Sequence, residues 1–481
     1  MSESSLKELT VVDVPLTSPD VPLTLTRHVV DELVKNDKIR ETDSEEETGL
    51  QLYCNINGNP ELTGFERECR GVVFCGDKLI LKAFPYPIET DTTDVDTLDV
   101  IKTKLSSNDV DNEVDNEVDN GARDNCMCFE SHEGALVRMF YFGSKWYTCT
   151  HRKLDAYRSK WASKTSFGQS FDNGLQSEVE VNEKLKNAIP EGDNPLLMRF
   201  QSLLDKSKQY MFLIRHNAEN RIVCQEPDRP TIYHVGTFVE GKLSMSENVY
   251  IPYPKRYYFK DINELTECVN NMDPRFLQGI IVFVHGNVQY KVLNTYYRDY
   301  FKIRGNEPSI PFQYLRIRNK REDRELLEYL YPHMKERFKS YENSLYTIAQ
   351  RILEVYKSRY IYGEILPLRP IQEFKILSAC HAWHKQDKAR NRIHLNKVIE
   401  IMNMQPATSL NFLIKQLEIE KKARFVDVEI TCSCSRSDTI TSNGSAMLKS
   451  KKSPPIAEEI QNLDSPMVKD PENIERSLED F

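Results

Sequence analysis

The sequence lacks any long hydrophobic run: no stretch of its 481 residues approaches the roughly 18 consecutive apolar residues that a transmembrane helix needs. Its first thirty residues also lack the basic and then apolar layout of a secretory signal. Cysteine follows no regular frame, and the odd total of 11 indicates reduced thiols. These absences predict a protein with no membrane association, in the cytoplasm or the nucleus.

Motifs for metal and phosphate binding are also missing. The sequence contains no Gly-rich phosphate-binding loop of the Walker type. Its Cys-x-Cys pairs, Cys126–Cys128 and Cys432–Cys434, have no second pair at zinc spacing, so no structural metal is expected. His381, His384 and His394 lie in a helical stretch, and we interpret them as histidines of a helix surface rather than as ligands.

Charge is distributed unevenly along the chain. The net charge is -9, yet Lys291 to Ile430 carries 26 Lys and Arg against 17 Asp and Glu. Such asymmetry indicates either a half that faces nucleic acid or a solvated helical surface. Charge alone does not separate the two interpretations.

Three polar segments are predicted to lie outside the folded core. Residues 1–45 are polar, with two VPLT repeats, and are predicted to form a mobile leader. Residues 107–125 repeat Val-Asp-Asn-Glu and bury almost nothing, which indicates a disordered acidic insertion. Residues 428–481 are rich in serine and are predicted to form a disordered tail.

Periodicity divides the remainder into two parts. Short apolar stretches broken by turn residues predict strands over residues 49–81, 127–154, 210–224 and 277–293, the last as a hairpin. Beyond Glu322, apolar residues are spaced three and four apart, which predicts helices. We therefore expect an α+β fold: a mixed α/antiparallel-β domain over 46–305, followed by an all-helical, basic domain over 312–427.

Several short segments, taken in order, form a pattern that each one alone would not. They are Glu68-Cys69-Arg70-Gly71-Val72-Val73-Phe74, Glu130-Ser131-His132-Glu133-Gly134-Ala135-Leu136-Val137, Asn220-Arg221-Ile222-Val223, Gln278-Gly279-Ile280-Ile281-Val282 and Tyr290-Lys291-Val292-Leu293-Asn294-Thr295-Tyr296-Tyr297. Their order, their spacing and the helical second half resemble the phage T4 RNA ligase 1 family of covalent nucleotidyltransferases. The resemblance covers roughly residues 46–425 and implies a nucleotidyltransferase fold.

That family's chemistry begins with a lysine that attacks the α-phosphate of ATP, with Mg²⁺ assisting. The lysine must lose its proton, so its surroundings have to lower its pKa. Aligned on Gly134, the nucleophile position is occupied by Ser131, and the aspartate of the motif becomes Glu133. The glutamate of the fourth segment becomes Gln278, and the second lysine of the fifth becomes Leu293. The third segment offers no carboxylate near Ile214 or Arg215.

Three residues near this position are candidate substitutes for the missing lysine: Ser131, His132 and Lys145. A serine hydroxyl is a weak nucleophile unless a base activates it. His132 follows Ser131, but strand neighbours point to opposite faces. Lys145 lies on the next predicted strand and is the other candidate. We expect decay of the catalytic set rather than its reinvention, because residues that act as a unit are lost together.

The resemblance then implies a nucleotide-binding set without a confident catalytic residue: Arg70, Glu133, Gly134, Arg221, Gln278 and Lys291. A further segment, Arg152–Trp161, interleaves basic and aromatic residues. It either grips a phosphate backbone and stacks a base, or is a solvated amphipathic helix with Tyr157 and Trp161 facing the core.

Three hypotheses follow for function. The first is a pseudoenzyme that binds nucleotide, RNA or protein, with RNA approaching residues 298–425. The second is an active divergent RNA ligase that uses ATP, Mg²⁺ and an atypical nucleophile, and the third is a protein scaffold without a ligand. Large DNA viruses carry divergent ligase relatives of this kind, which makes a viral source one expectation.

Overall fold

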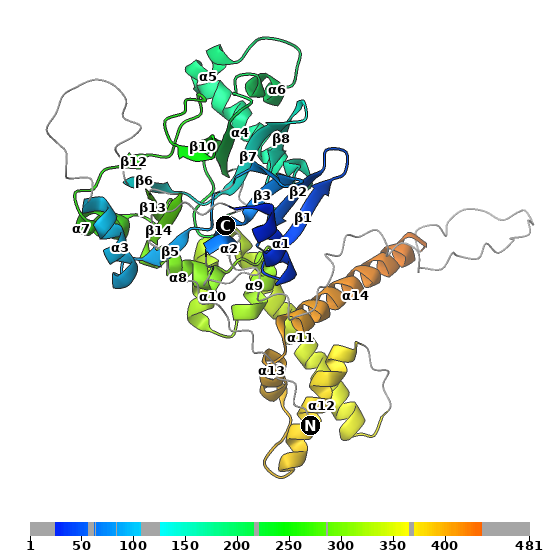
Figure 1. Cartoon of the computed structure of the whole chain (residues 1–481). Helices are drawn as coiled ribbons and strands as arrows, with labels where there is room; N and C mark the ends of the chain where they lie inside the picture. Colours follow the sequence, from blue (N-terminus) through cyan, green and yellow to red (C-terminus); the bar gives the residue numbers. More distant parts are fainter. Residues whose placement is uncertain are drawn as a thin grey trace, which may run out of the picture. The chain divides into compact units, whose positions relative to one another are not determined.

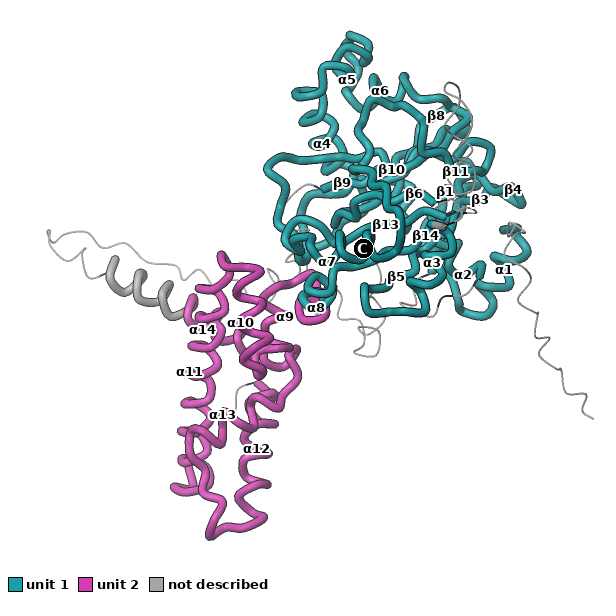
Figure 2. The backbone as a smooth tube through the Cα atoms, turned by 90° about the vertical axis from the view of Figure 1, so that its left-hand side faces the viewer, with its two compact units in different colours: residues 1–301, 475–481 teal, residues 302–474 magenta. Residues whose placement is uncertain are grey.

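The computed structural model of the chain divides into two compact units, residues 1–301 with 475–481 and residues 302–474 (Figure 2). It describes residues 25–55, 62, 64–82, 84–106, 126–215, 221–284, 287–364 and 370–434, the last without the side chains of 424–434. None of the helices in these ranges is both long enough and apolar enough to cross a bilayer.

Three sheets build the first unit (Figure 1). One is antiparallel, in the order β1 (Arg40–Glu45), β2 (Leu50–Cys54), β3 (Arg70–Cys75) and β4 (Lys78–Leu81). The second is also antiparallel, in the order β11 (Lys242–Ser244), β10 (Thr231–Val239), β9 (Gln209–Arg215), β7 (Ala135–Phe142) and β8 (Lys145–Cys149). The third runs β12 (Arg256–Tyr257), β6 (Cys126–Ser131), β13 (Gly279–Val284), β14 (Val288–Leu293) and β5 (Ile88–Asp91), with only β14 and β5 parallel.

Helices cover the sheets because each sheet has an apolar face to bury. The helices of this unit are α1 (Arg27–Lys35), α2 (Gly64–Glu68), α3 (Val95–Ser106), α4 (Phe167–Val181), α5 (Glu183–Ala188), α6 (Leu196–Gln201), α7 (Ile262–Asn271) and α8 (Thr295–Arg304), with a 3-10 turn η1 (Ala156–Arg158). Phe171 and Leu175 of α4 pack against the second sheet, and Leu265 and Val269 of α7 pack against the third. Apolar residues of all three sheets meet in a shared core, which contains Val73 of the first sheet, Phe140 of the second, and Phe129 and Phe283 of the third.

The second unit is helical. It contains α9 (Ile310–Ile317), α10 (Arg321–Leu330), a 3-10 turn η3 (Pro332–Met334), α11 (Lys335–Tyr360), α12 (Ile371–Gln386), α13 (Leu395–Asn403) and α14 (Ala407–Cys434). Tyr314 of α9 stacks on Phe338 of α11 with ring centroids 4.4 Å apart. The predicted α+β class, a mixed antiparallel body followed by an all-helical region, is confirmed.

The predicted ends of the folded region need correction. The leader was expected to run to residue 45, yet α1 and β1 lie within it. Thr26 caps α1 by accepting a hydrogen bond from the Val29 N–H at 3.4 Å, and β1 pairs with β2. The helix is only 9 residues long, shorter than the window of roughly 11–18 residues in which helical periodicity is recognised, which explains the error. The tail was expected from residue 428, but α14 continues to Cys434. The rest of both segments and the whole acidic insertion, 107–125, lie outside the described residues.

Candidate functional site

A cavity of about 190 Å³ lies in the first unit, next to the connection from β6 to β7. Residues 132–134 form this connection, which carries the chain from the third sheet into the second. The cavity is lined by six of the residues singled out in the sequence: Arg70, Ser131, His132, Gly134, Gln278 and Lys291. Segments that are far apart in the sequence therefore meet at one site.

Close backbone contacts hold this site together. Gly71 has a positive φ of 82°, and a Cβ there would lie 2.6 Å from the Cα of His151. Arg138, which is fully buried on β7, donates hydrogen bonds to the carbonyls of Gly71 and Thr150. At Gly134, a Cβ would lie 2.5 Å from the carbonyl oxygen of Ile214 on β9. Both glycines are needed because the neighbouring backbone leaves no room for a side chain.

Ser131 occupies the nucleophile position, and its hydroxyl is already engaged. It donates a hydrogen bond to Gln278 Oε1 at 3.0 Å, and both side chains are buried. An amide oxygen is not a base at neutral pH, so this contact does not activate the hydroxyl.

His132 does not serve Ser131 either. Its ring stacks on Tyr233 at 4.7 Å, and its Nε2 lies 3.2 Å from Glu130 Oε2. Burial alone would raise the pKa of Glu130, but contacts with His132 and Tyr257 hold that pKa below its usual value. The imidazole is thus directed at a carboxylate and not at the serine hydroxyl.

Glu133 lies behind the cavity wall rather than on it. Its carboxylate accepts hydrogen bonds from the N–H groups of Ile222 and Val223, at 3.0 and 2.6 Å, and from the Tyr297 hydroxyl at 2.7 Å. Burial, and then the nearby Glu133 carboxylate, raise the pKa of Tyr297 well above its ordinary value. No role for Tyr297 was predicted, and its place in the fifth segment was the only signal in the sequence.

The Tyr297 hydroxyl also links Glu133 to the cavity wall. Gln278 Nε2 donates to Tyr297 at 2.7 Å, so a chain of hydrogen bonds runs Ser131, Gln278, Tyr297, Glu133. These hydrogen bonds join the second, fourth and fifth segments of the motif pattern. Of the four linked side chains, only Glu133, at the end farthest from the cavity, carries a charge.

The remaining predicted residues are engaged away from the cavity. Arg221 donates from Nε to the carbonyl of Cys224 at 3.0 Å and does not line the cavity. Lys145, the candidate substitute nucleophile, lies at the start of β8, where its ammonium contacts Glu45 Oε1 at 2.7 Å. Lys145 does not line the cavity either, so it cannot deliver an amine there.

The segment 151–161 forms part of the cavity wall. Arg152, Lys160 and Trp161 line the cavity, together with His151. The two other basic residues of this segment face Asp43: Lys153 at 3.3 Å and Arg158 at 3.7 Å. The only helical element is the short η1, so the amphipathic helix that was one interpretation of this segment does not form.

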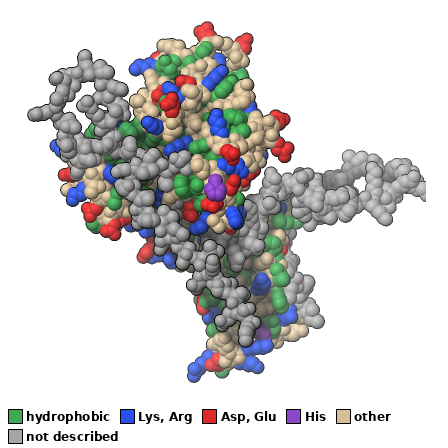
Figure 3. Space-filling view, viewed as in Figure 1, with side chains coloured by type: hydrophobic (Ala, Val, Ile, Leu, Met, Phe, Trp, Pro, Cys, Tyr) green, Lys and Arg blue, Asp and Glu red, His purple; other side chains and the backbone are tan. Residues whose placement is uncertain are grey.

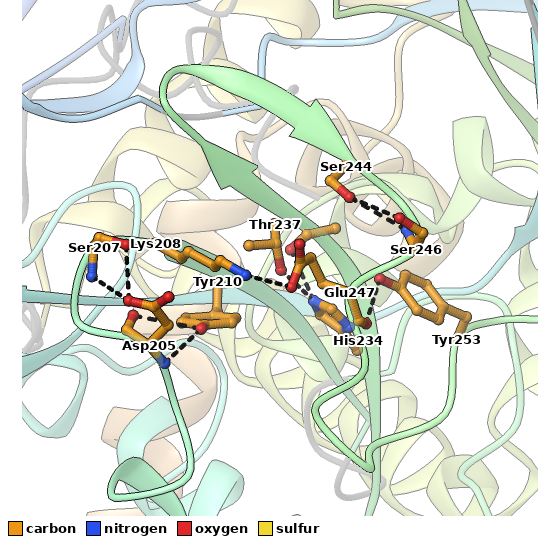
Figure 4. A network of polar contacts seen from close by, with 11 residues as sticks. Asp205, Ser207, Lys208, Tyr210, His234, Thr237, Ser244, Ser246, Glu247 and Tyr253 are labelled. Carbon is orange, nitrogen blue, oxygen red and sulfur yellow. Dashed lines mark hydrogen bonds and ion pairs between the residues drawn. The ribbon is translucent and has the colours of Figure 1, made fainter. Parts of the chain in front are cut away.

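A second polar cluster, around His234, has the residue types of a hydrolase site but not its geometry (Figure 4). His234 is fully buried, and its Nε2 donates to the Gly236 carbonyl at 3.1 Å and contacts Thr237 Oγ1 at 2.8 Å. Burial lowers its pKa to about 4. Asp205 accepts from Ser207 at 2.7 Å instead of orienting the histidine. We assign this cluster a structural role.

Comparisons with known proteins point to viral relatives and to ligases. No family model matches the chain. A protein of Invertebrate iridescent virus 6, named immediate-early protein ICP-46 homolog, is 28% identical over 427 residues, which cover 83% of this chain and 89% of that protein. An archaeal ATP-dependent RNA ligase is similar in structure with a TM-score of 0.34 and 11% identity, over 65% of this chain and 78% of the ligase. A putative ATP-dependent DNA ligase from Aquifex aeolicus gives a TM-score of 0.30 and 11% identity, over 65% and 76% of the two chains. Both TM-scores are below 0.5, so the overall likeness to these ligases is weak.

Proposed function

We propose that this chain is an RNA ligase-like pseudoenzyme that binds nucleotide or RNA in its cavity without forming a covalent intermediate. The observation that carries the proposal is the contact between Ser131 and Gln278. At these two positions the T4 RNA ligase 1 pattern has a lysine and a glutamate. Here they are a hydroxyl and an amide that hydrogen bond to each other.

A nucleotide is the ligand class that best fits the cavity. The wall combines Arg70, Arg152, Lys160 and Lys291 with apolar and aromatic side chains such as Trp161, Phe129, Phe283 and Leu213. Cationic groups bind phosphate, and flat apolar surfaces stack bases. ATP is the first ligand to test.

An active nucleotidyltransferase with an atypical nucleophile is the second candidate. Lys160 favours it, because this exposed residue brings a primary amine to the cavity wall. A direct test is incubation of the full chain with Mg²⁺ or Mn²⁺ and α-labelled ATP or GTP, followed by denaturation. We expect no label to remain on the protein. A stoichiometric adduct that disappears in Lys160→Arg, but persists in Lys242→Arg on exposed β11, would establish the active alternative.

Equilibrium binding separates a pseudoenzyme from a scaffold without a ligand. We expect ATP to bind the unmodified chain and Arg70→Gln to weaken binding about tenfold, because a charge-assisted phosphate contact contributes about 1.5 kcal/mol or more. The matched control is Arg275→Gln, since Arg275 pairs with Asp273 and does not line the cavity. Absence of binding by the unmodified chain would favour the scaffold.

We further propose that RNA contacts the helical unit within residues 298–425. Lys and Arg side chains gather at one end of this unit (Figure 3). The exposed cations at the end of α11, in α12 and in the segment that follows α12 are Lys357, Arg359, Lys375, Lys385, Lys388, Arg390 and Arg392. Aromatic rings lie among them: the Arg359 guanidinium is 5.7 Å from the Tyr360 ring centroid, and Lys397 Nζ is 4.2 Å from that of Trp383. Cations interleaved with aromatic rings are typical of surfaces that bind single-stranded RNA.

Charge reversal tests this surface. Replacing Lys388, Arg390 and Arg392 by glutamate is expected to weaken RNA binding at least about tenfold and to make it less dependent on salt, because fewer counterions are released. The control reverses Lys320 and Arg321, which are exposed at the start of α10. Equal loss in both variants would indicate a general charge effect and contradict a defined site.

A further inference from the structure

Four cationic side chains line the cavity. Arg70 comes from the start of β3, Lys291 from β14, and Arg152 and Lys160 from the segment after β8. Of the described residues that line the cavity, Glu130 alone carries a carboxylate. Among the described residues, the wall therefore carries an excess of positive charge.

The carboxylates at the motif positions are poor candidates for Mg²⁺ ligands. Glu130 accepts from the Tyr257 hydroxyl at 3.1 Å through Oε1, and its Oε2 faces His132. Glu133 accepts three hydrogen bonds behind the wall, and Gln278 Oε1 accepts the Ser131 hydroxyl. Mg²⁺ prefers carboxylate and water oxygens in an octahedral set. Within the described ranges, no three His, Cys, Asp or Glu side chains are grouped to hold a metal. The residues present do not fit Mg²⁺.

The cationic side chains of the wall are placed to neutralise phosphate charge in place of a metal ion. The Arg70 guanidinium lies 5.2 Å from the Tyr86 ring centroid, and no carboxylate among the described residues pairs with it. Lys291 pairs with Glu89 at 2.7 Å, and Glu89 is half exposed, so a phosphate group can displace it toward solvent. Guanidinium and ammonium groups neutralise phosphate charge directly.

We infer that the cavity binds the phosphates of a nucleotide through Arg70, Arg152, Lys160 and Lys291, without a divalent cation. This inference rests on the proposed function and deepens it. It implies that Mg²⁺ weakens nucleotide binding to this chain instead of strengthening it. Mg²⁺ neutralises part of the triphosphate charge, so it competes with the cations of the wall for the same oxygens.

The test is calorimetric titration of the full chain with ATP, once in EDTA and once in excess Mg²⁺. We expect binding in EDTA, at least about threefold tighter than with Mg²⁺, because the uncomplexed triphosphate carries more negative charge. Binding that requires Mg²⁺, or that Mg²⁺ strengthens, would overturn this inference and leave the proposed function standing. Absence of binding under both conditions would overturn both.

Variants show whether the named cations are responsible. Arg152→Gln and Lys160→Gln are each expected to weaken binding in EDTA about fivefold or more and to reduce its salt dependence. Arg275→Gln and Lys242→Gln are the controls, since neither residue lines the cavity. Circular dichroism of each variant reports folding independently of binding. Folded variants with unchanged affinity would refute the assignment.

Discussion

The cavity wall and the layer of residues directly behind it differ in whether the motif positions carry charged side chains. On the wall, Ser131 and Gln278 stand where the resemblance implies a lysine and a glutamate, so these two positions carry no formal charge. Behind it, Glu133 keeps the acidic character of the motif, but its carboxylate accepts hydrogen bonds from two backbone N–H groups and from Tyr297. The Glu133 carboxylate therefore holds together segments that lie behind the wall.

The difference has a physical cause. A buried carboxylate is tolerated when hydrogen bonds satisfy it, and removing it leaves its donors unpaired. The Glu133 position is constrained by folding, whether or not a reaction takes place. A charged pair on the wall would contribute little to folding because burying it costs desolvation energy, so folding does not require these two positions to be charged.

The strongest test of this contrast is Glu133→Ala. This substitution leaves the N–H groups of Ile222 and Val223 and the Tyr297 hydroxyl without their hydrogen-bond acceptor. We therefore expect the free energy of unfolding to fall by about 4 kcal/mol. Urea unfolding followed by the fluorescence of Trp146 and Trp161 measures it. In the control, Glu130→Ala, the partners are closer to solvent and the loss should be about 1 kcal/mol. Similar losses of unfolding free energy in both variants would contradict the distinction between the cavity wall and the layer behind it.

Restoring a lysine on the wall should also be costly. Ser131→Lys places an ammonium beside the neutral Gln278 at a position only 5% exposed, and we expect a loss of about 3 kcal/mol in stability. Adding Gln278→Glu should recover part of that loss by pairing the charge. A double-mutant cycle in urea gives the coupling energy, which should be at least about 1 kcal/mol. A coupling energy near zero would mean that the side chains at positions 131 and 278 do not interact.

The buried His234 cluster adds a pH-dependent comparison. Its folded pKa of about 4 lies below the unfolded value of about 6.5, so the unfolded chain binds the proton first as pH falls. Stability should therefore be complete near pH 7 and decline by roughly 2 kcal/mol by pH 5. The measurement is urea unfolding at both pH values. His234→Gln should show a smaller decline, and an unchanged pH dependence would contradict this assignment.

The smallest effect is expected at Lys145. Its ammonium pairs with Glu45 on a half-exposed surface, and such pairs contribute about 0.5 kcal/mol or less. Lys145→Ala should leave both stability and ATP binding nearly unchanged. Loss of ATP binding in this variant would show that Lys145 contributes to the nucleotide site.

Part of the candidate site could be predicted from sequence because local segments kept recognisable residues in order. Arg70, Ser131, His132, Gly134, Gln278 and Lys291 do line one cavity. The direction of each side chain could not be predicted. Glu133 follows His132 directly, yet His132 lines the cavity and Glu133 turns behind it, toward residues 222 and 223.

The segment 151–161 shows the limit of periodicity. Its alternation of basic and aromatic residues was compatible with a surface helix, because that pattern contains no information about distant partners. The approach of Gly71 to His151 and the buried Arg138 decide its course, and they carry Arg152 and Lys160 to the cavity.

By itself, the sequence determined the α+β class, the change to helices in the second half and the lack of a lysine at position 131. These follow from spacing and identity, which are local properties. Only the tertiary structure decided which charges face the cavity. The Tyr297–Glu133 bond spans 164 residues of sequence, and contacts of that range arise from how the sheets and helices pack, not from any pattern within one segment.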